Sequence, residues 1–136
     1  MTAESETASF HPNWLRFMYV VNIFVVGGIA VLLLVVPDMA ASLFSAPAQE
    51  PLFSGYASSY MLAIAIFSIL GLRSPLKFSP ALFLQAIGKI VWFVAVLVPA
   101  LIAGPLSTFA IYLVATFLPI LIGDLIVTPC KYIFKK

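Results

Sequence analysis

Charged side chains are scarce in this chain of 136 residues: Asp, Glu, Lys and Arg together make up 9%, whereas hydrophobic residues make up 63%. Soluble globular domains carry about 25% charged residues. The mean hydropathy of +1.15 is correspondingly high. A water-soluble fold would have to cover its apolar helices with polar chain, and too little polar chain is present for that. The composition therefore excludes an ordinary soluble domain.

Cysteine and histidine are nearly absent, with one residue of each, Cys130 and His11. A single cysteine excludes a disulfide framework, a CxxC redox pair and a thiolate metal site within the chain. A single histidine excludes haem held by two histidines of one chain and a histidine-based metal site. The sequence also lacks a nucleophile elbow, a phosphate-binding glycine loop and paired carboxylates. We therefore expect no catalytic residues, no bound metal and no cofactor, and a chain that is non-catalytic on its own.

Long apolar runs are what the sequence has instead. Each is about 20 residues or longer, and about 20 helical residues cross the roughly 30 Å hydrocarbon layer of a bilayer. They predict an all-α integral membrane protein: a single domain (1–136), built as a four-transmembrane-helix bundle behind a polar N-terminal tail (1–13). The four predicted spans are 17–36, 52–72, 81–103 and 106–128.

Prolines and glycines mark the connections between these spans. Pro37 ends the first span, and 39–44 predicts a short amphipathic turn along the outer membrane surface. The segment 73–80 predicts a tight connection, with Ser79-Pro80 as the start of the third helix. Gly104-Pro105 leaves so short a turn that the third and fourth spans must be antiparallel neighbours.

Small residues recur every fourth position in the second span, at Gly55, Ser59 and Ala63. Such a series lets two helix backbones approach closely in a membrane. We expect it to serve ordinary helix packing.

The basic residues outside the spans all lie on one side of the predicted bundle. The connections on the other side, 37–51 and 104–105, contain no Lys or Arg. Because flanking positive residues stay in the cytoplasm, both termini are predicted to be cytoplasmic. These basic residues lie at the membrane surface, which suits contact with anionic lipid and argues against a nucleic-acid partner. The six basic residues are Arg16, Arg73, Lys77, Lys131, Lys135 and Lys136, and the aromatic residues expected at the headgroup layer are Trp14, Tyr19, Tyr56 and Tyr132.

Only two charged side chains lie well inside the spans, Lys89 and Asp124. Lys89 is about 12 Å and Asp124 about 6 Å from the cytoplasmic end of its helix, so both fall in the inner half of the bilayer. A lone charge at a helix centre costs about 2.5–3.5 kcal/mol, so we expect the two to pair. Gln85, one turn from Lys89, is expected to complete the hydrogen bonding of that pair. Asn22 and Ser68 lie at matching depth, so each span supplies a polar group to one intramembrane polar cluster.

This cluster has three interpretations. The charged pair fixes the register of the helices and has no further role. Alternatively, Lys89 or Asp124 binds a solute, a lipid headgroup or a quinone at the cytoplasmic mouth. In the third interpretation the pair is the proton or ion relay of a small transporter.

Two stretches resemble a known type of membrane protein. They are 69–80 (ILGLRSPLKFSP), followed by Gln85, Lys89 and Trp92, and 123–129 (GDLIVTP). They are similar to small bacterial four-helix membrane proteins of the DoxX-like broad type. The resemblance implies a four-helix bundle in the bacterial inner (cytoplasmic) membrane and a loose connection to a quinone-linked oxidoreductase subunit. It carries no catalytic residue over to this chain.

The functional expectation is an accessory or structural subunit of a membrane complex, with other membrane proteins or further copies of the chain as partners. The alternative is a small-molecule, lipid or quinone binder, or a small transporter, that uses an inner-leaflet pocket around Lys89 and Asp124. A closed, dry ion pair favours the subunit, whereas a water-accessible polar cavity favours the alternative.

Overall fold

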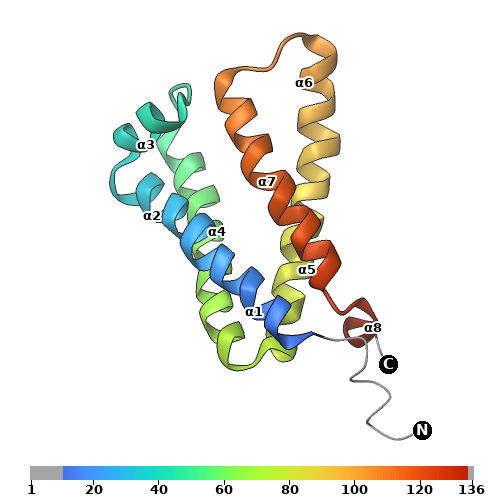
Figure 1. The fold of residues 1–136 in the computed structure, drawn as a ribbon. Helices are drawn as coiled ribbons and strands as arrows, with labels where there is room; N and C mark the ends of the chain where they lie inside the picture. Colours follow the sequence, from blue (N-terminus) through green and yellow to red (C-terminus); the bar gives the residue numbers. More distant parts are fainter. Residues whose placement is uncertain (1–10, 135–136) are drawn as a thin grey trace, which may run out of the picture.

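Four long helices dominate the computed structural model, which describes residues 11–134 (Figure 1). Every regular element in that part of the chain is helical, and the four helices are long and apolar enough to cross a membrane. This confirms the predicted all-helical class and the number of long apolar helices. Residues 1–10 of the predicted polar tail lie outside the described part. The long helices run over Pro12–Val35, Pro51–Arg73, Pro75–Ala103 and Thr108–Val127.

The first long helix consists of α1 (Pro12–Val21), a π-helical turn η3 (Asn22–Val26) and α2 (Gly27–Val35). It begins at Pro12, a residue that needs no hydrogen-bond acceptor in the first turn. It ends before a second proline, which starts α3 (Pro37–Phe44). The predicted surface turn at 39–44 is therefore part of a short helix, which Ser45 closes in the left-handed conformation with φ of 52°.

The second long helix is α4 (Pro51–Arg73), and its start is capped by Glu50. The two oxygens of the Glu50 carboxylate accept hydrogen bonds from the backbone N–H groups of Leu52 at 3.1 Å and Phe53 at 2.7 Å. This satisfies two of the donors that a helix leaves free at its first turn, and the negative charge favours the positive end of the helix dipole.

The third long helix joins α5 (Pro75–Trp92), a π-helical turn η4 (Phe93–Leu97) and α6 (Val98–Ala103). The prediction that it starts at Ser79-Pro80 is wrong, because the helix begins at Pro75 and contains Pro80. A proline inside a helix leaves the carbonyl four residues earlier without its N–H donor. Here the buried Ser79 hydroxyl donates to that carbonyl, on Leu76, at 2.8 Å. The Ser79 hydroxyl thus replaces the N–H that Pro80 lacks, and the helix continues through Pro80.

The fourth long helix, α7 (Thr108–Val127), is capped by the Ser107 hydroxyl, which accepts from the Ala110 N–H at 3.2 Å. Gly104, with φ of 154°, ends α6 and allows the reversal into α7. A last short helix, α8 (Cys130–Ile133), follows. The α1 start, the α4–α5 connection and α8 lie at one end of the bundle, whereas α3 and the α6–α7 connection lie at the other (Figure 1). We call these the basic end and the outer end.

Most of the core lies in the half of the bundle near the basic end. Two glycines there allow helices to touch. A Cβ added at Gly71 of α4 would lie 2.6 Å from the Tyr19 ring of α1, and one at Gly123 of α7 would lie 2.6 Å from the Met18 sulfur. The first long helix is thus held tightly between α4 and α7. The buried core cluster is Leu15, Met18, Tyr19, Val26, Leu82 and Ile120.

The small-residue series of α4 does not pack inside the bundle, contrary to expectation. Ser59 and Ala63 are exposed, and a Cβ added at Gly55 would meet nothing within 4 Å. We call Gly55, Ser59 and Ala63 the small-residue face. Its spacing suits close helix contact, but no helix of the described chain occupies it.

Candidate functional site

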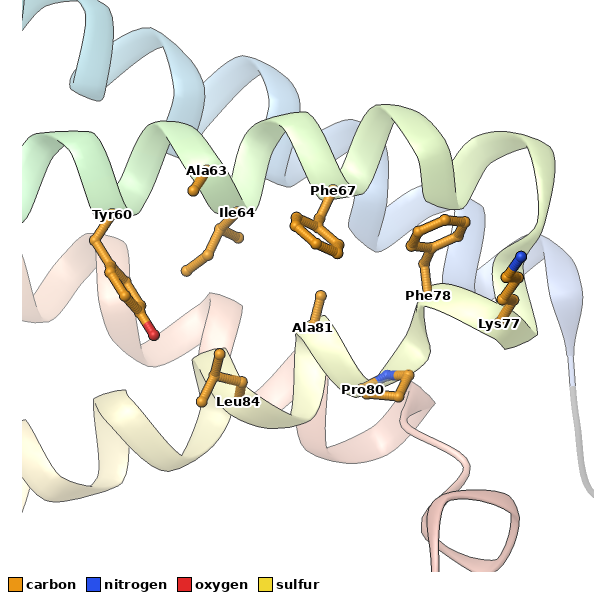
Figure 2. A pocket seen from close by; sticks show the side chains of 9 residues that line it. All are labelled: Tyr60, Ala63, Ile64, Phe67, Lys77, Phe78, Pro80, Ala81 and Leu84. Carbon is orange, nitrogen blue, oxygen red and sulfur yellow. The ribbon is translucent and has the colours of Figure 1, made fainter.

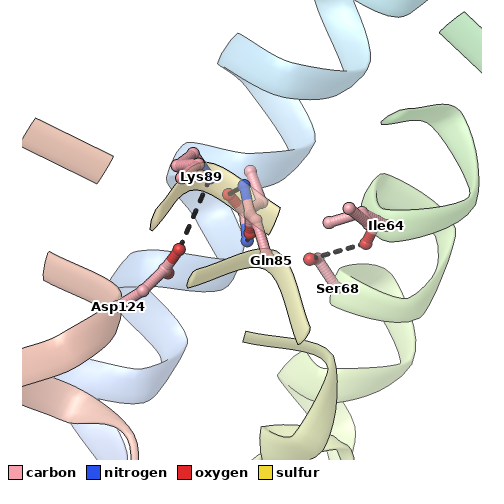
Figure 3. Close-up of polar contacts among 6 residues, drawn as sticks. Ile64, Ser68, Gln85, Lys89 and Asp124 are labelled. Atoms are coloured by element: carbon pink, nitrogen blue, oxygen red, sulfur yellow. Dashed lines mark hydrogen bonds and ion pairs between the residues drawn. The ribbon is translucent and has the colours of Figure 1, made fainter. Parts of the chain in front are cut away.

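Lys89 of α5 and Asp124 of α7 face each other in the interior of the bundle (Figure 3). The Lys89 Nζ lies 3.6 Å from the Asp124 Oδ2, and the two residues are 7% and 0% exposed. The structure thus brings together the two charges that the sequence placed at similar depth on antiparallel helices. The separation exceeds an ordinary N–H···O hydrogen bond of about 2.7–3.2 Å, so the contact is ionic without a direct hydrogen bond.

A second polar contact links the first long helix to α5. The Asn22 side-chain N–H₂ donates to the Gln85 Oε1 at 2.8 Å, and the Gln85 N–H₂ donates to the Asn22 Oδ1 at 3.1 Å. The two carboxamides therefore satisfy each other, and both are buried. This corrects the expectation that Gln85 completes the hydrogen bonding of Lys89 and Asp124. Gln85 is committed to Asn22, which is also the first residue of the π-helical turn η3.

Ser68 is buried in α4, but its hydroxyl donates to the Ile64 carbonyl of its own helix at 2.8 Å (Figure 3). A serine bonded in this way is satisfied without a partner on another helix. Of the five predicted cluster residues, four therefore form two side-chain pairs between helices, and Ser68 adds a polar group that needs no neighbour.

The charged pair is left with unused hydrogen-bonding capacity. The Lys89 Nζ and both carboxylate oxygens of Asp124 have no hydrogen-bond partner among the described residues, and neither does the buried Thr128 Oγ1. Thr128 lies one turn beyond Asp124 and was missed from the sequence. The four-residue spacing, which places both side chains on one face of the helix axis, was the signal for it. The Lys89–Asp124 pair combines a buried donor with buried acceptors, so it has the groups needed to bind a water molecule or exchange a proton.

Tyr19 was expected at the headgroup layer, but its ring faces the interior of the bundle. Its side chain is fully buried, and its hydroxyl donates to the Pro75 carbonyl at 2.7 Å. That carbonyl belongs to the first turn of α5. Tyr19 therefore joins the first long helix to the start of α5 through its hydroxyl. Its ring packs against Gly71 of α4.

Cavities open on the surface of the bundle, and the following two are not lined by Lys89 or Asp124. The first, of about 500 Å³, lies between α4 and α5. The second, of about 180 Å³, lies toward the outer end among α2, α3, α4 and α7, and its walls include Phe44, Phe53, Tyr112 and Phe117. Neither cavity is therefore the predicted inner-leaflet pocket around the charged pair. The pair itself is buried in the bundle.

Metal ligands do not gather in the described residues 11–134, which hold no group of three or more His, Cys, Asp or Glu side chains placed to bind a metal ion. No family model, no curated protein and no solved structure matches this chain. The resemblance to DoxX-like proteins therefore stays a prediction from sequence.

Proposed function

We propose that this chain is a bacterial inner-membrane protein that spans the bilayer four times with both termini in the cytoplasm. The length and apolar character of the four helices support insertion. The placement of Arg16, Arg73, Lys77 and Lys131 at the basic end supports the orientation, because flanking positive charges stay in the cytoplasm.

The exposed Cys130 at the basic end provides the test of orientation. A membrane-impermeant maleimide should leave Cys130 unlabelled in intact cells and label it after permeabilisation. Labelling of intact cells to the same extent contradicts the orientation. Release of the protein from membranes by alkaline carbonate contradicts insertion itself.

Within the membrane we propose the role of an accessory subunit that packs against a larger membrane protein. The small-residue face carries this proposal. Gly55, Ser59 and Ala63 have the four-residue spacing that lets transmembrane helices touch, and the described chain leaves the face uncovered. We place the contact at Gly55 and Ser59, because Ala63 also lines the cavity between α4 and α5. The closed Lys89–Asp124 pair supports the same reading, since both residues are buried and line neither surface cavity.

Purification from native membranes in mild detergent tests this role. Gly55→Leu and Ser59→Leu should lower the amount of a co-purifying membrane protein by on the order of tenfold, because added bulk prevents close helix contact. Gly88→Leu is the matched control: Gly88 lies in α5, is exposed, and has equally open space around a new Cβ. Equal recovery of the partner with Gly55→Leu, Ser59→Leu and Gly88→Leu contradicts the proposal, as does recovery of the chain only as a homo-oligomer.

A small transporter is the second candidate, and one observation favours it: the unpartnered polar atoms of Lys89, Asp124 and Thr128. Ionisable side chains inside a membrane are costly and mark proton or ion paths in many transporters. The candidate requires proton or solute flux in liposomes containing the purified chain alone, with loss of that flux in Asp124→Asn. Absence of flux in the wild-type chain removes it.

A further inference from the structure

The larger of the two cavities is a groove on the surface between α4 and α5 (Figure 2). Its volume is about 500 Å³ and its lining is almost entirely apolar. Ala63 and Ala81 leave the groove open in the middle, because both side chains are only a methyl group. Phe67 and Leu84, each 49% exposed, form parts of its two walls. Among the described residues, the groove is lined by α4 and α5 and by no other helix.

The groove lies in one leaflet of the proposed membrane. Along α4 it runs from Phe67 toward Tyr60, and along α5 from Lys77 to Leu84, each about 10 Å at 1.5 Å per residue. One leaflet contributes about 15 Å of the hydrocarbon layer. The groove therefore starts near the basic end at Lys77, and at Tyr60, about 20 Å from Arg73 along α4, it reaches the middle of the bilayer, as a lipid chain does.

A single cation stands at the mouth of this apolar groove. Lys77 lies in the first turn of α5, is exposed, and holds its Nζ 5.9 Å from the centre of the Phe78 ring. Among the described residues, the ion pair is formed by Lys89 and Asp124, and Lys77 pairs with no acidic side chain. An ammonium at the headgroup level above an apolar groove complements a lipid with a negative phosphate and an acyl chain.

We propose that the α4–α5 groove binds an anionic phospholipid, with one acyl chain between Phe67 and Leu84 and the phosphate at the Lys77 ammonium. The site rests on the proposed insertion into the membrane. It requires no conformational change, since the groove is already open toward the surface. Anionic lipid is the favoured occupant because a neutral lipid leaves the Lys77 charge unused.

Native mass spectrometry of the protein released from nanodiscs tests the site. The nanodiscs contain equal parts of phosphatidylglycerol and phosphatidylcholine, and the readout is the ratio of the two lipids retained. The wild-type protein should retain phosphatidylglycerol preferentially. Lys77→Gln should reduce this preference about fivefold, the effect of one basic residue near an anionic surface. Lys77→Arg should keep most of it.

Arg73→Gln is the matched control for charge. Arg73 is also a basic residue at this end, but it lies on average about 130° around α4 from the residues that line the groove, at 3.6 residues per turn. Its removal should leave the lipid preference unchanged. An equal loss in Arg73→Gln and Lys77→Gln, or no loss in Lys77→Gln, overturns the proposal.

Two further variants test the groove itself. Ala81→Trp and Ala63→Trp fill it and should reduce the retention of both lipids, whereas Ala115→Trp on an exposed position of α7 should not. Thermal unfolding in detergent identifies any variant that fails to fold. Unchanged lipid retention in both folded groove variants overturns the site, and so does a protein partner that occupies the groove and leaves no lipid bound. Failure of membrane insertion is detected separately by carbonate extraction and refutes the proposed function first.

Discussion

The half of the bundle near the basic end and the half near the outer end are held together differently. Near the basic end, Tyr19, Asn22 and Asp124 are fully buried, and side-chain pairs join the helices. Toward the outer end, none of the residues of α6 (Val98–Ala103) is buried, and the buried residues of α7 all lie in its second half. Near the basic end, burial thus coincides with polar pairs between helices.

The difference has a physical reason in the proposed membrane. Lipid is as apolar as leucine, so burying a leucine against another helix gains little there. What remains to join helices is close van der Waals contact at small residues and hydrogen bonds or ion pairs between them. Gly71 and Gly123 provide the contacts, and the Asn22–Gln85 and Lys89–Asp124 pairs provide the polar bonds. At the outer end α6 has no buried residue, so its surface is free for lipid or a partner.

Breaking the ion pair should have the largest effect on this difference. Lys89→Met or Asp124→Leu alone leaves one buried charge without its partner, which costs about 3–5 kcal/mol of folding free energy. The double variant Lys89→Met/Asp124→Leu removes both charges and should recover a large part of that loss. Unfolding in detergent with increasing sodium dodecyl sulfate measures all three. Strictly additive losses would mean that the two side chains do not interact.

Glycine substitutions should give the next largest effect and separate the two kinds of surface. Gly71→Ala forces a methyl group into the Tyr19 ring, with a contact of 2.6 Å that the fully buried ring cannot easily relieve. Overpacking of this kind costs about 1–3 kcal/mol. Gly88→Ala meets nothing within 4 Å and should be neutral or stabilising by up to about 1 kcal/mol, because alanine favours the helix. The same unfolding assay compares them, and equal losses would refute the tight packing of Tyr19 on Gly71.

The sequence sufficed for the helices and for the charged pair, because both follow from strong local rules. Apolar runs of membrane-crossing length predict helices, and two isolated charges on antiparallel neighbours predict a pair. The predicted start of α5 was wrong because the sequence Ser79-Pro80 is typical of a helix start, whereas the helix begins at Pro75. Only the structure shows the Ser79 hydroxyl replacing the donor that Pro80 lacks at the Leu76 carbonyl.

The amide pair and the position of Tyr19 were out of reach for a different reason. Gln85 is one turn from Lys89, so sequence spacing favoured a local partner over Asn22, which is 63 residues away. Tyr19 near a helix end has the pattern of a headgroup residue. Its burial depends on Gly71, far along the chain on α4, which leaves space for the ring. Such choices depend on which helix faces are in contact, and a single sequence does not contain that information.

Removing one member of the amide pair should have a moderate effect. Gln85→Leu leaves the Asn22 carboxamide buried without its two hydrogen bonds, and Asn22→Leu does the same to Gln85. Polar contacts between membrane helices are worth about 0.6 kcal/mol on average and up to about 1.7 kcal/mol. Each single variant should lose a free energy of unfolding in this range, and Asn22→Leu/Gln85→Leu should lose less than the sum. A double variant that loses the full sum would show that the two amides act independently.

The smallest effect is expected at the outer end. Ile102 of α6 is 82% exposed, so Ile102→Ala removes a side chain that faces lipid or a partner rather than the bundle. The free energy of unfolding of the Ile102→Ala variant in detergent should differ from that of the wild-type protein by no more than about 0.5 kcal/mol, the usual range for surface positions. Leu82→Ala, at a fully buried position of α5, is the matched comparison and should destabilise the chain more. If Ile102→Ala destabilises the purified chain as much as Leu82→Ala, then α6 packs against protein in the isolated molecule, and the contrast between the two halves disappears. If the loss is seen only in native membranes, a partner covers α6, and the outer half is part of the proposed interface.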